Sequence, residues 1–66
     1  MDIQTIYKYL HHTVLLDLNN GFRYKIKLTE DIIVGDTLSF IGKKGEPVDF
    51  KISEIAFITI SKEDSQ

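Results

Sequence analysis

The sequence has no cysteine, no long apolar run and no excess of positive charge. Without cysteine, the chain forms neither a disulfide nor a zinc site with thiolate ligands, which suits a reducing compartment. No stretch approaches the roughly 18 apolar residues of a membrane-spanning helix. The start of the chain also lacks the basic and apolar regions of a signal peptide. We therefore expect a cytoplasmic protein without a membrane segment.

The balance of charge limits the possible partners. Eight Lys and Arg residues against ten Asp and Glu residues give a net charge of -2, with a pI near 5.5. A dedicated nucleic-acid binder is usually basic, because contacts with phosphates supply much of its affinity. The total charge argues against that role, although a local cluster of cations can still bind nucleic acid.

Signatures of catalysis are missing as well. The chain has no glycine-rich phosphate loop and no nucleophile motif. A chain this short rarely encloses a ligand pocket of about 300 Å³ or more. We expect a non-enzymatic protein with no cofactor, no metal and no small-molecule substrate. Its length allows one domain, which we place at residues 1–61, followed by a polar tail at 62–66.

The hydrophobic periodicity predicts a mainly β protein that begins with a short helix. Over residues 2–11 the apolar spacing is helical, and Asp2 is a suitable N-cap. This apolar stripe consists of Ile3, Ile6, Tyr7 and Leu10. From Thr13 onward the period changes to two, which predicts strands. The whole pattern favours a five-stranded small barrel of the SH3-like or Sm-like kind.

The first two strands form a predicted hairpin around Asn19-Asn20-Gly21. A two-residue loop would place apolar Leu18 beside charged Arg23. A three-residue loop makes one face wholly apolar and pairs opposite charges on the other, so we favour it, with Gly21 in the left-handed conformation. The pairs of this register are Leu18 with Phe22, Leu16 with Tyr24, Val14 with Ile26 and Asp17 with Arg23.

Three further strands are expected after a break at Thr29–Asp36. The third covers Thr37–Ile41, the fourth has Val48, Phe50 and Ile52 on its apolar face, and the fifth covers Ile55–Ser61. We expect Ile55 and Phe57 on one face of the fifth strand and Ala56, Ile58 and Ile60 on the other. A strand that is apolar on both faces needs cover on both, which the N-terminal helix or another subunit would supply, and a chain this small has a marginal core. We therefore expect a homo-oligomer, with an interface formed by Ile55, Phe57, Ile58 and Ile60.

Several polar groups are candidates for binding. The second strand carries a basic strip, Arg23, Lys25 and Lys27, which Lys43 and Lys44 extend in a nearby loop. We interpret the strip as a solvated strand face, with nucleic acid or an acidic protein as alternative partners. Adjacent histidines at 11 and 12 point in different directions and do not share a metal. The carboxylates of Glu30, Asp31 and Asp36 suit turns and caps better than a metal site.

The order of elements resembles that of the Sm-like proteins, including the Hfq type. The stretch "TVLLDLNNGFRYKIKL" is similar to their first hairpin, and "VDFKISEIAFITIS" to their last two strands. The resemblance implies a ring of six or seven subunits, joined through the fourth and fifth strands, that binds single-stranded RNA. Phe50 and Lys51 match the family's aromatic and lysine positions, and Ile52 stands in place of its histidine.

Two functions follow as hypotheses. The first is a protein-interaction or regulatory accessory module that self-associates through its last strand. The alternative is an Sm-like oligomer that binds single-stranded RNA through Arg23, Lys25, Lys27, Lys43, Lys44, Phe50 and Lys51.

Overall fold

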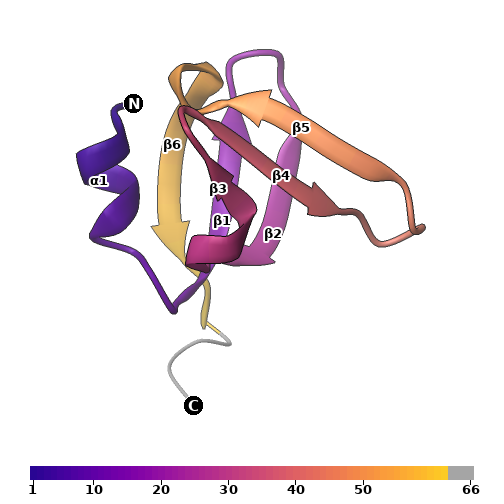
Figure 1. The fold of residues 1–66 in the computed structure, drawn as a ribbon, viewed down its shortest axis with the longest axis horizontal. Coiled ribbons are helices and arrows are strands. Elements are labelled where there is room, and N and C mark those ends of the chain that lie inside the picture. The colour runs from indigo at the N-terminus through magenta and orange to yellow at the C-terminus, as the bar shows by residue number, and fades with distance from the viewer. Residues whose placement is uncertain (63–66) are drawn as a thin grey trace.

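The computed structural model describes residues 1–62 and consists of two small antiparallel sheets and one short helix (Figure 1). Residues 63–66 of the predicted polar tail lie outside the described residues. The elements in chain order are α1 (Ile3–Tyr7), β1 (Thr13–Leu18), β2 (Arg23–Lys27), the 3-10 helix η1 (Glu30–Ile32), β3 (Ile33–Val34), β4 (Thr37–Ile41), β5 (Pro47–Lys51), the 3-10 helix η2 (Ile52–Glu54) and β6 (Ile55–Ile60).

The structure differs from the predicted five-stranded small barrel in two respects. Residues 1–62 contain six strands, and they form two three-stranded sheets, ordered β2-β1-β6 and β3-β4-β5. No strand of one sheet pairs with a strand of the other in this part of the chain. The 3-10 helices η1 and η2 lie at the two crossings between the sheets, and a helical turn there interrupts the strand ladder. The mainly β class with an N-terminal helix is confirmed.

The predicted three-residue hairpin loop is confirmed. Leu16 pairs with Tyr24, and Asp17 pairs with Arg23. The backbone N–H of Leu18 donates to the carbonyl of Phe22 at 2.8 Å, which closes the loop. Gly21 has φ 91°, a conformation that costs residues with a Cβ about 1–2 kcal/mol. The opposite charges and the apolar face together select this register.

The additional strand is β3, which lies in the segment predicted as a break. It is only two residues long, and Val34 pairs with Thr37 across a two-residue turn. Gly35 occupies the first turn position with φ 62°, where a hairpin turn with glycine first requires a positive φ. Strand β4 covers Thr37–Ile41, as predicted.

The N-terminal helix is shorter than the predicted span of 2–11. It ends at Tyr7, and the chain then turns until His11, whose φ is 72°. The N–H of His11 donates to the carbonyl of Leu28 at 2.6 Å, and the N–H of Leu28 donates to the carbonyl of His12. The pairing with the end of β2 therefore competes with continuation of the helix, and tertiary structure overrides the local periodicity.

The predicted N-cap of α1 is confirmed. Oδ1 of Asp2 accepts a hydrogen bond from the backbone N–H of Thr5 at 2.9 Å and another from the Thr5 hydroxyl at 2.8 Å. These bonds favour the charged carboxylate, so the backbone bond first and the hydroxyl bond second hold the pKa of Asp2 below its ordinary value of 3.8.

This cap predicts a specific sensitivity to acid. Because the pKa of Asp2 is lowered in the folded chain, its contribution to stability is present above the ordinary value of 3.8 and is lost as the pH falls through the lowered value. Asn caps helices as well as Asp does but does not titrate in this range. In thermal unfolding followed by circular dichroism, Asp2→Asn should therefore lose less stability than the wild type below pH 3.8. Identical acid limbs for the two proteins would contradict the prediction.

The core lies between the two sheets, beneath α1. Its buried apolar side chains come from the helix, from both sheets, from η2 and from the residue that follows β2: Ile6, Val14, Leu16, Leu18, Leu28, Leu38, Val48, Phe50, Ile52 and Ile55. At one end the ring of Tyr24 stacks on that of Phe50, with centroids 5.6 Å apart, and meets the ring of Phe40 edge-on. These aromatic contacts join β2 to β4 and β5.

Strand β6 contains a bulge that changes which residues share a face. Leu18 lies opposite Ile55 and Asp17 lies opposite Phe57, so Ala56 is the extra residue. Ile55 therefore lies on the inner face with Ile58, opposite Leu18 and Leu16, and not with Phe57. The predicted face assignment of Ile55 is wrong for this reason, since a period of two without a bulge places it on the outer face with Phe57.

Candidate interaction site

The outer edge of β6 is an open strand edge. The N–H of Leu18 donates to the carbonyl of Phe22, and the N–H of Leu28 donates to the carbonyl of His12. The backbone groups of the even-numbered residues of β1 therefore point toward β2. The backbone groups of the odd-numbered residues of β1 point toward β6, as the hydrogen bond from the Ser61 N–H to the Thr13 carbonyl at 2.8 Å shows. Backbone groups alternate along a strand. The N–H and C=O groups of Ile58 and Ile60 therefore point away from β1, toward the edge.

Nothing in the described chain covers this edge with backbone hydrogen bonds. The helix α1 stands on the β6 side of the molecule in Figure 1, but residues 1–62 show no backbone bond between α1 and β6. An unpaired strand edge is a template for another strand.

The side chains of β6 add apolar surface to this open edge. Phe57 on the outer face is 68% exposed and Ile60 is 45% exposed. Ile58 is half-buried, and Ile55 is buried in the chain's own core. Of the four predicted interface residues, Phe57 and Ile60 are thus accessible to a partner, Ile58 is partly so, and Ile55 acts as a core residue within the single chain.

The other three edge strands carry features that discourage pairing. Strand β2 is basic on its outer face, at Arg23, Lys25 and Lys27, and β3 is only two residues long. Strand β5 begins with Pro47, which has no N–H, and the N–H of Lys51 at its end donates to Oε2 of Glu54 at 2.9 Å. No charge and no proline lies within β6. It is the least protected edge of the described chain.

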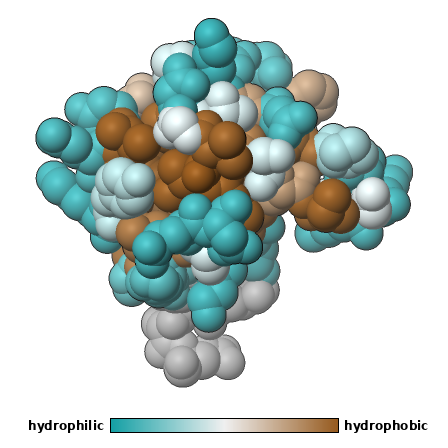
Figure 2. Space-filling model, viewed as in Figure 1, coloured by the Kyte–Doolittle hydropathy of each residue, from teal (hydrophilic) through white to brown (hydrophobic). Residues whose placement is uncertain are grey.

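Apolar surface is not confined to β6. Val34 on β3 is 62% exposed and Ile41 at the end of β4 is 68% exposed. Figure 2 shows apolar side chains gathered over the middle of one face, with a separate apolar spot toward the β4–β5 hairpin. Val34 lies on a strand too short to offer a long edge, and Ile41 lies beside charged loop residues. Val34 and Ile41 therefore expose apolar surface without the long row of unpaired backbone groups that β6 presents, and they serve as controls for β6.

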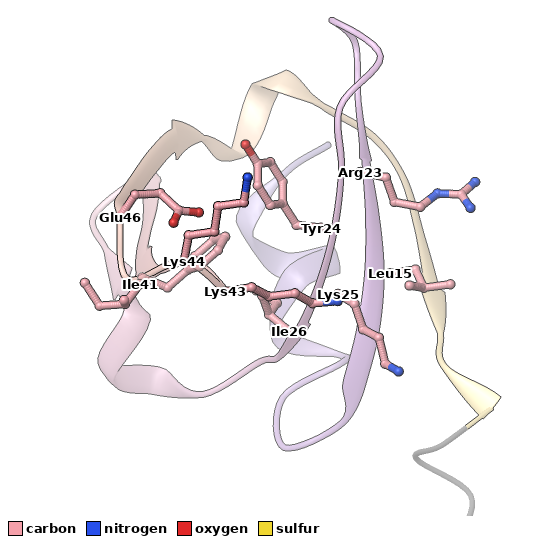
Figure 3. A pocket seen from close by; sticks show the side chains of 11 residues that line it. Leu15, Arg23, Tyr24, Lys25, Ile26, Ile41, Lys43, Lys44 and Glu46 are labelled. Carbon is pink, nitrogen blue, oxygen red and sulfur yellow. The ribbon is translucent and has the colours of Figure 1, made fainter.

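A cleft of about 580 Å³ lies between β2 and the β4–β5 hairpin (Figure 3). Tyr24 and Phe40 contribute aromatic rings, and Lys43 and Lys44 contribute positive charge. The complete lining is Leu15, Arg23, Tyr24, Lys25, Ile26, Phe40, Ile41, Gly42, Lys43, Lys44 and Glu46. Such a mixture of cations and rings is typical of sites for anionic aromatic ligands.

The structure brings together only part of the predicted nucleic-acid set. Arg23, Lys25, Lys43 and Lys44 all line the cleft. Figure 3 shows, however, that the guanidinium of Arg23 points away from the loop that carries Lys43 and Lys44. Lys27 and Lys51 do not line the cleft. Phe50 is 8% exposed and stacked on Tyr24, so its ring lies within the core.

Electrostatics explain the orientation of Arg23. Its Nε donates to Oδ1 of Asp17 at 2.6 Å, across the paired strands. This hydrogen bond and the attraction between the two charges raise the pKa of Arg23 above its ordinary value. The pairing of opposite charges on this face was predicted from the sequence. It also neutralises one of the three cations of the basic strip.

The remaining polar candidates have structural partners. Nε2 of His11 lies 3.5 Å from Oε1 of Glu30, with both side chains exposed. A hydrogen bond from the Thr29 hydroxyl, followed by one from its own backbone, lowers the pKa of Asp31. Within residues 1–62, no three His, Cys, Asp or Glu side chains are grouped to hold a metal ion. The described chain also contains no helix of the length and apolarity that a membrane crossing requires.

Sequence reasoning placed Lys43 and Lys44 of the β4–β5 hairpin near the basic strip but missed the other hairpin residues of the cleft. Phe40, Ile41 and Glu46 reach the cleft because the β4–β5 hairpin approaches β2 in space. No local pattern marks that approach.

Comparisons of the chain with protein-family models, with curated proteins and with solved structures gave no match.

Proposed function

We propose that this protein is a small non-enzymatic binding module that self-associates through β6. The observation that carries the proposal is the open edge of β6, with Phe57 68% exposed in the middle of the strand. Strand pairing supplies main-chain hydrogen bonds, and burial of apolar side chains contributes about 25 cal/mol per Å². We further propose that the assembled module is an accessory protein that binds another protein. The acidic total charge favours a protein partner over nucleic acid.

Light scattering on the purified protein tests this proposal. The mass should exceed that of one chain, 7.6 kDa, and should depend on concentration between about 1 and 200 μM, as mass action requires. The 260/280 nm absorbance ratio of the same peak reports any nucleic acid that elutes with the protein. A single-chain mass at every concentration would refute self-association.

A second candidate function is binding of single-stranded RNA at the cleft. The observation in its favour is the proximity of Lys43 and Lys44 to the rings of Tyr24 and Phe40. Bases stack on aromatic rings and phosphates contact lysines, each with modest sequence preference. This function is compatible with self-association, and the Sm-like resemblance of the sequence agrees with it.

The cleft lysines should control RNA affinity and its response to salt. If Lys43 and Lys44 each contact a phosphate, the double variant Lys43→Ala/Lys44→Ala should reduce the slope of log affinity against log salt by about 1.4, at ~0.7 for each contact with a single strand. Fluorescence anisotropy with labelled RNA oligonucleotides of mixed sequence measures this slope. The matched control is Lys27→Ala/Lys51→Ala, since neither residue lines the cleft. Equal losses in both variants would point to attraction by overall charge instead of the cleft.

A further inference from the structure

The unpaired backbone N–H and C=O groups along the open edge of β6 can form hydrogen bonds with the same strand of a second copy. We propose that the partner of β6 is β6 of a second copy, paired antiparallel about a two-fold axis that passes through Ile58. This inference rests on the proposed self-association and specifies its geometry: a dimer with one continuous sheet ordered β2-β1-β6-β6-β1-β2. It differs from a head-to-tail ring, in which β6 would pair with β5 of the next copy.

Backbone donors decide between these two arrangements. In the two-fold arrangement, Ile58 exchanges both of its hydrogen bonds with Ile58 of the second copy. Ile60 faces Ala56 of the second copy, and the reverse pair forms by symmetry. Ala56 is the extra residue of the bulge and stands outside the Cα register of β1 and β6. The edge-facing N–H groups of Ile58 and Ile60 therefore each lie opposite a residue of the second copy.

Strand β5 cannot offer the same complement. Its bonds from Gly42 to Glu46 and from Ile52 to Asp36 place the even-numbered residues of β5 against β4. Its edge-facing positions are therefore Pro47, Asp49 and Lys51. Pro47 has no N–H, and the N–H of Lys51 already donates to Glu54. Asp49 is the one described residue on this edge with an uncommitted amide, so a β5–β6 contact would leave a carbonyl acceptor of β6 unsatisfied, which costs free energy once it is buried.

The side chains of β6 also complement themselves. About the two-fold axis, Phe57 lies directly opposite Thr59 of the second copy on the outer face. The two Phe57 residues then become diagonal neighbours about 7–8 Å apart, a separation that aromatic side chains can bridge. On the inner face the pairing covers Ile60, which is 45% exposed in the single chain. Because β6 carries no charge, no like charges meet at the axis.

A single-cysteine cross-link tests the geometry, since the natural chain has no cysteine. Thr59 is exposed on the outer face, and its copies are diagonal neighbours about the axis, about 7–8 Å apart. The matched control is Ser53, which is exposed in η2 outside β6, so its copies stand at opposite ends of the paired strands. Each variant, Thr59→Cys and Ser53→Cys, is treated with a short bis-maleimide. Denaturing gels report covalent dimers, and light scattering on the same samples reports the mass before treatment.

The outcomes separate this inference from the proposed function. A mass of two chains with efficient cross-linking of Thr59→Cys, at least ten times that of Ser53→Cys, is the expected result. A larger assembly of six or seven chains, in which Thr59→Cys does not cross-link, would overturn the two-fold pairing and leave self-association through β6 standing as a head-to-tail contact. A single-chain mass for the wild type and both variants would refute both.

Discussion

Leu16→Ala should remove a large share of the stability of the folded chain. Leu16 is completely buried and lies in the central strand of its sheet, opposite Tyr24 on one side and Ile58 on the other. Truncation of a buried leucine costs about 2–5 kcal/mol, through lost transfer free energy and the cavity left behind. A chain of 66 residues has a total stability of only about 3–10 kcal/mol at ~0.05–0.15 kcal/mol per residue. Urea unfolding followed by circular dichroism measures the loss.

The neighbouring leucine provides the control for this experiment. Leu15 carries the same side chain one residue earlier, but it lies on the outer face and is half-buried. Leu15→Ala should therefore cost about 1 kcal/mol or less, because little apolar surface returns to water. If the two variants lost equal stability, the assignment of β1 faces would be incorrect, since a shift of one residue exchanges the two faces.

Phe57→Lys should dissociate the proposed β6 assembly without unfolding the chain. The substitution places a charged group in the middle of an apolar edge, and lysine on an edge strand is a common means of preventing strand pairing. Loss of a buried phenylalanine contact is worth about 1.5–3 kcal/mol, so the dissociation constant should rise by roughly 10- to 100-fold. In the two-fold dimer both copies of the substitution lie near the axis, which adds repulsion between like charges. Sedimentation equilibrium over a range of concentrations measures the change.

The comparison for Phe57→Lys is Ile41→Lys. Ile41 has the same exposed fraction, 68%, but lies at the end of β4, away from β6. Both substitutions remove an exposed apolar side chain and add one charge, so they change net charge and nonspecific apolar association in the same way. The assembly should persist in Ile41→Lys. Dissociation by Ile41→Lys and not by Phe57→Lys would move the interface to the β4–β5 hairpin.

The parts of the fold that the sequence predicts are those encoded by neighbouring residues. The register of the first hairpin follows from two local requirements, an apolar face and the pairing of Asp17 with Arg23, and both are met. The N-cap of α1 and the bounds of β4 are local in the same sense. Each of these features can be recognised from residues within a few positions or across one turn.

The parts that the sequence does not predict depend on contacts between distant segments. The helix stops early because His11 and His12 bond to Leu28. The bulge at Ala56 becomes visible only when β6 is aligned with β1, because an isolated strand with an extra residue still alternates. The cleft arises from the approach of the β4–β5 hairpin to β2. For the candidate site, the apolar character of β6 was evident from its residues, whereas the protection of the β5 edge by Glu54 was not.

The alternation of backbone groups along β6 has a consequence for amide hydrogen exchange. In the single chain, the amides of Phe57 and Thr59 point toward β1 and those of Ile58 and Ile60 point toward the open edge. Exchange with deuterium should therefore be slow, fast, slow and fast at four successive residues. Association through this edge protects Ile58 and Ile60 and converts the alternation into uniform protection. The deuterium pattern of four amides thus records, residue by residue, whether the strand is shared.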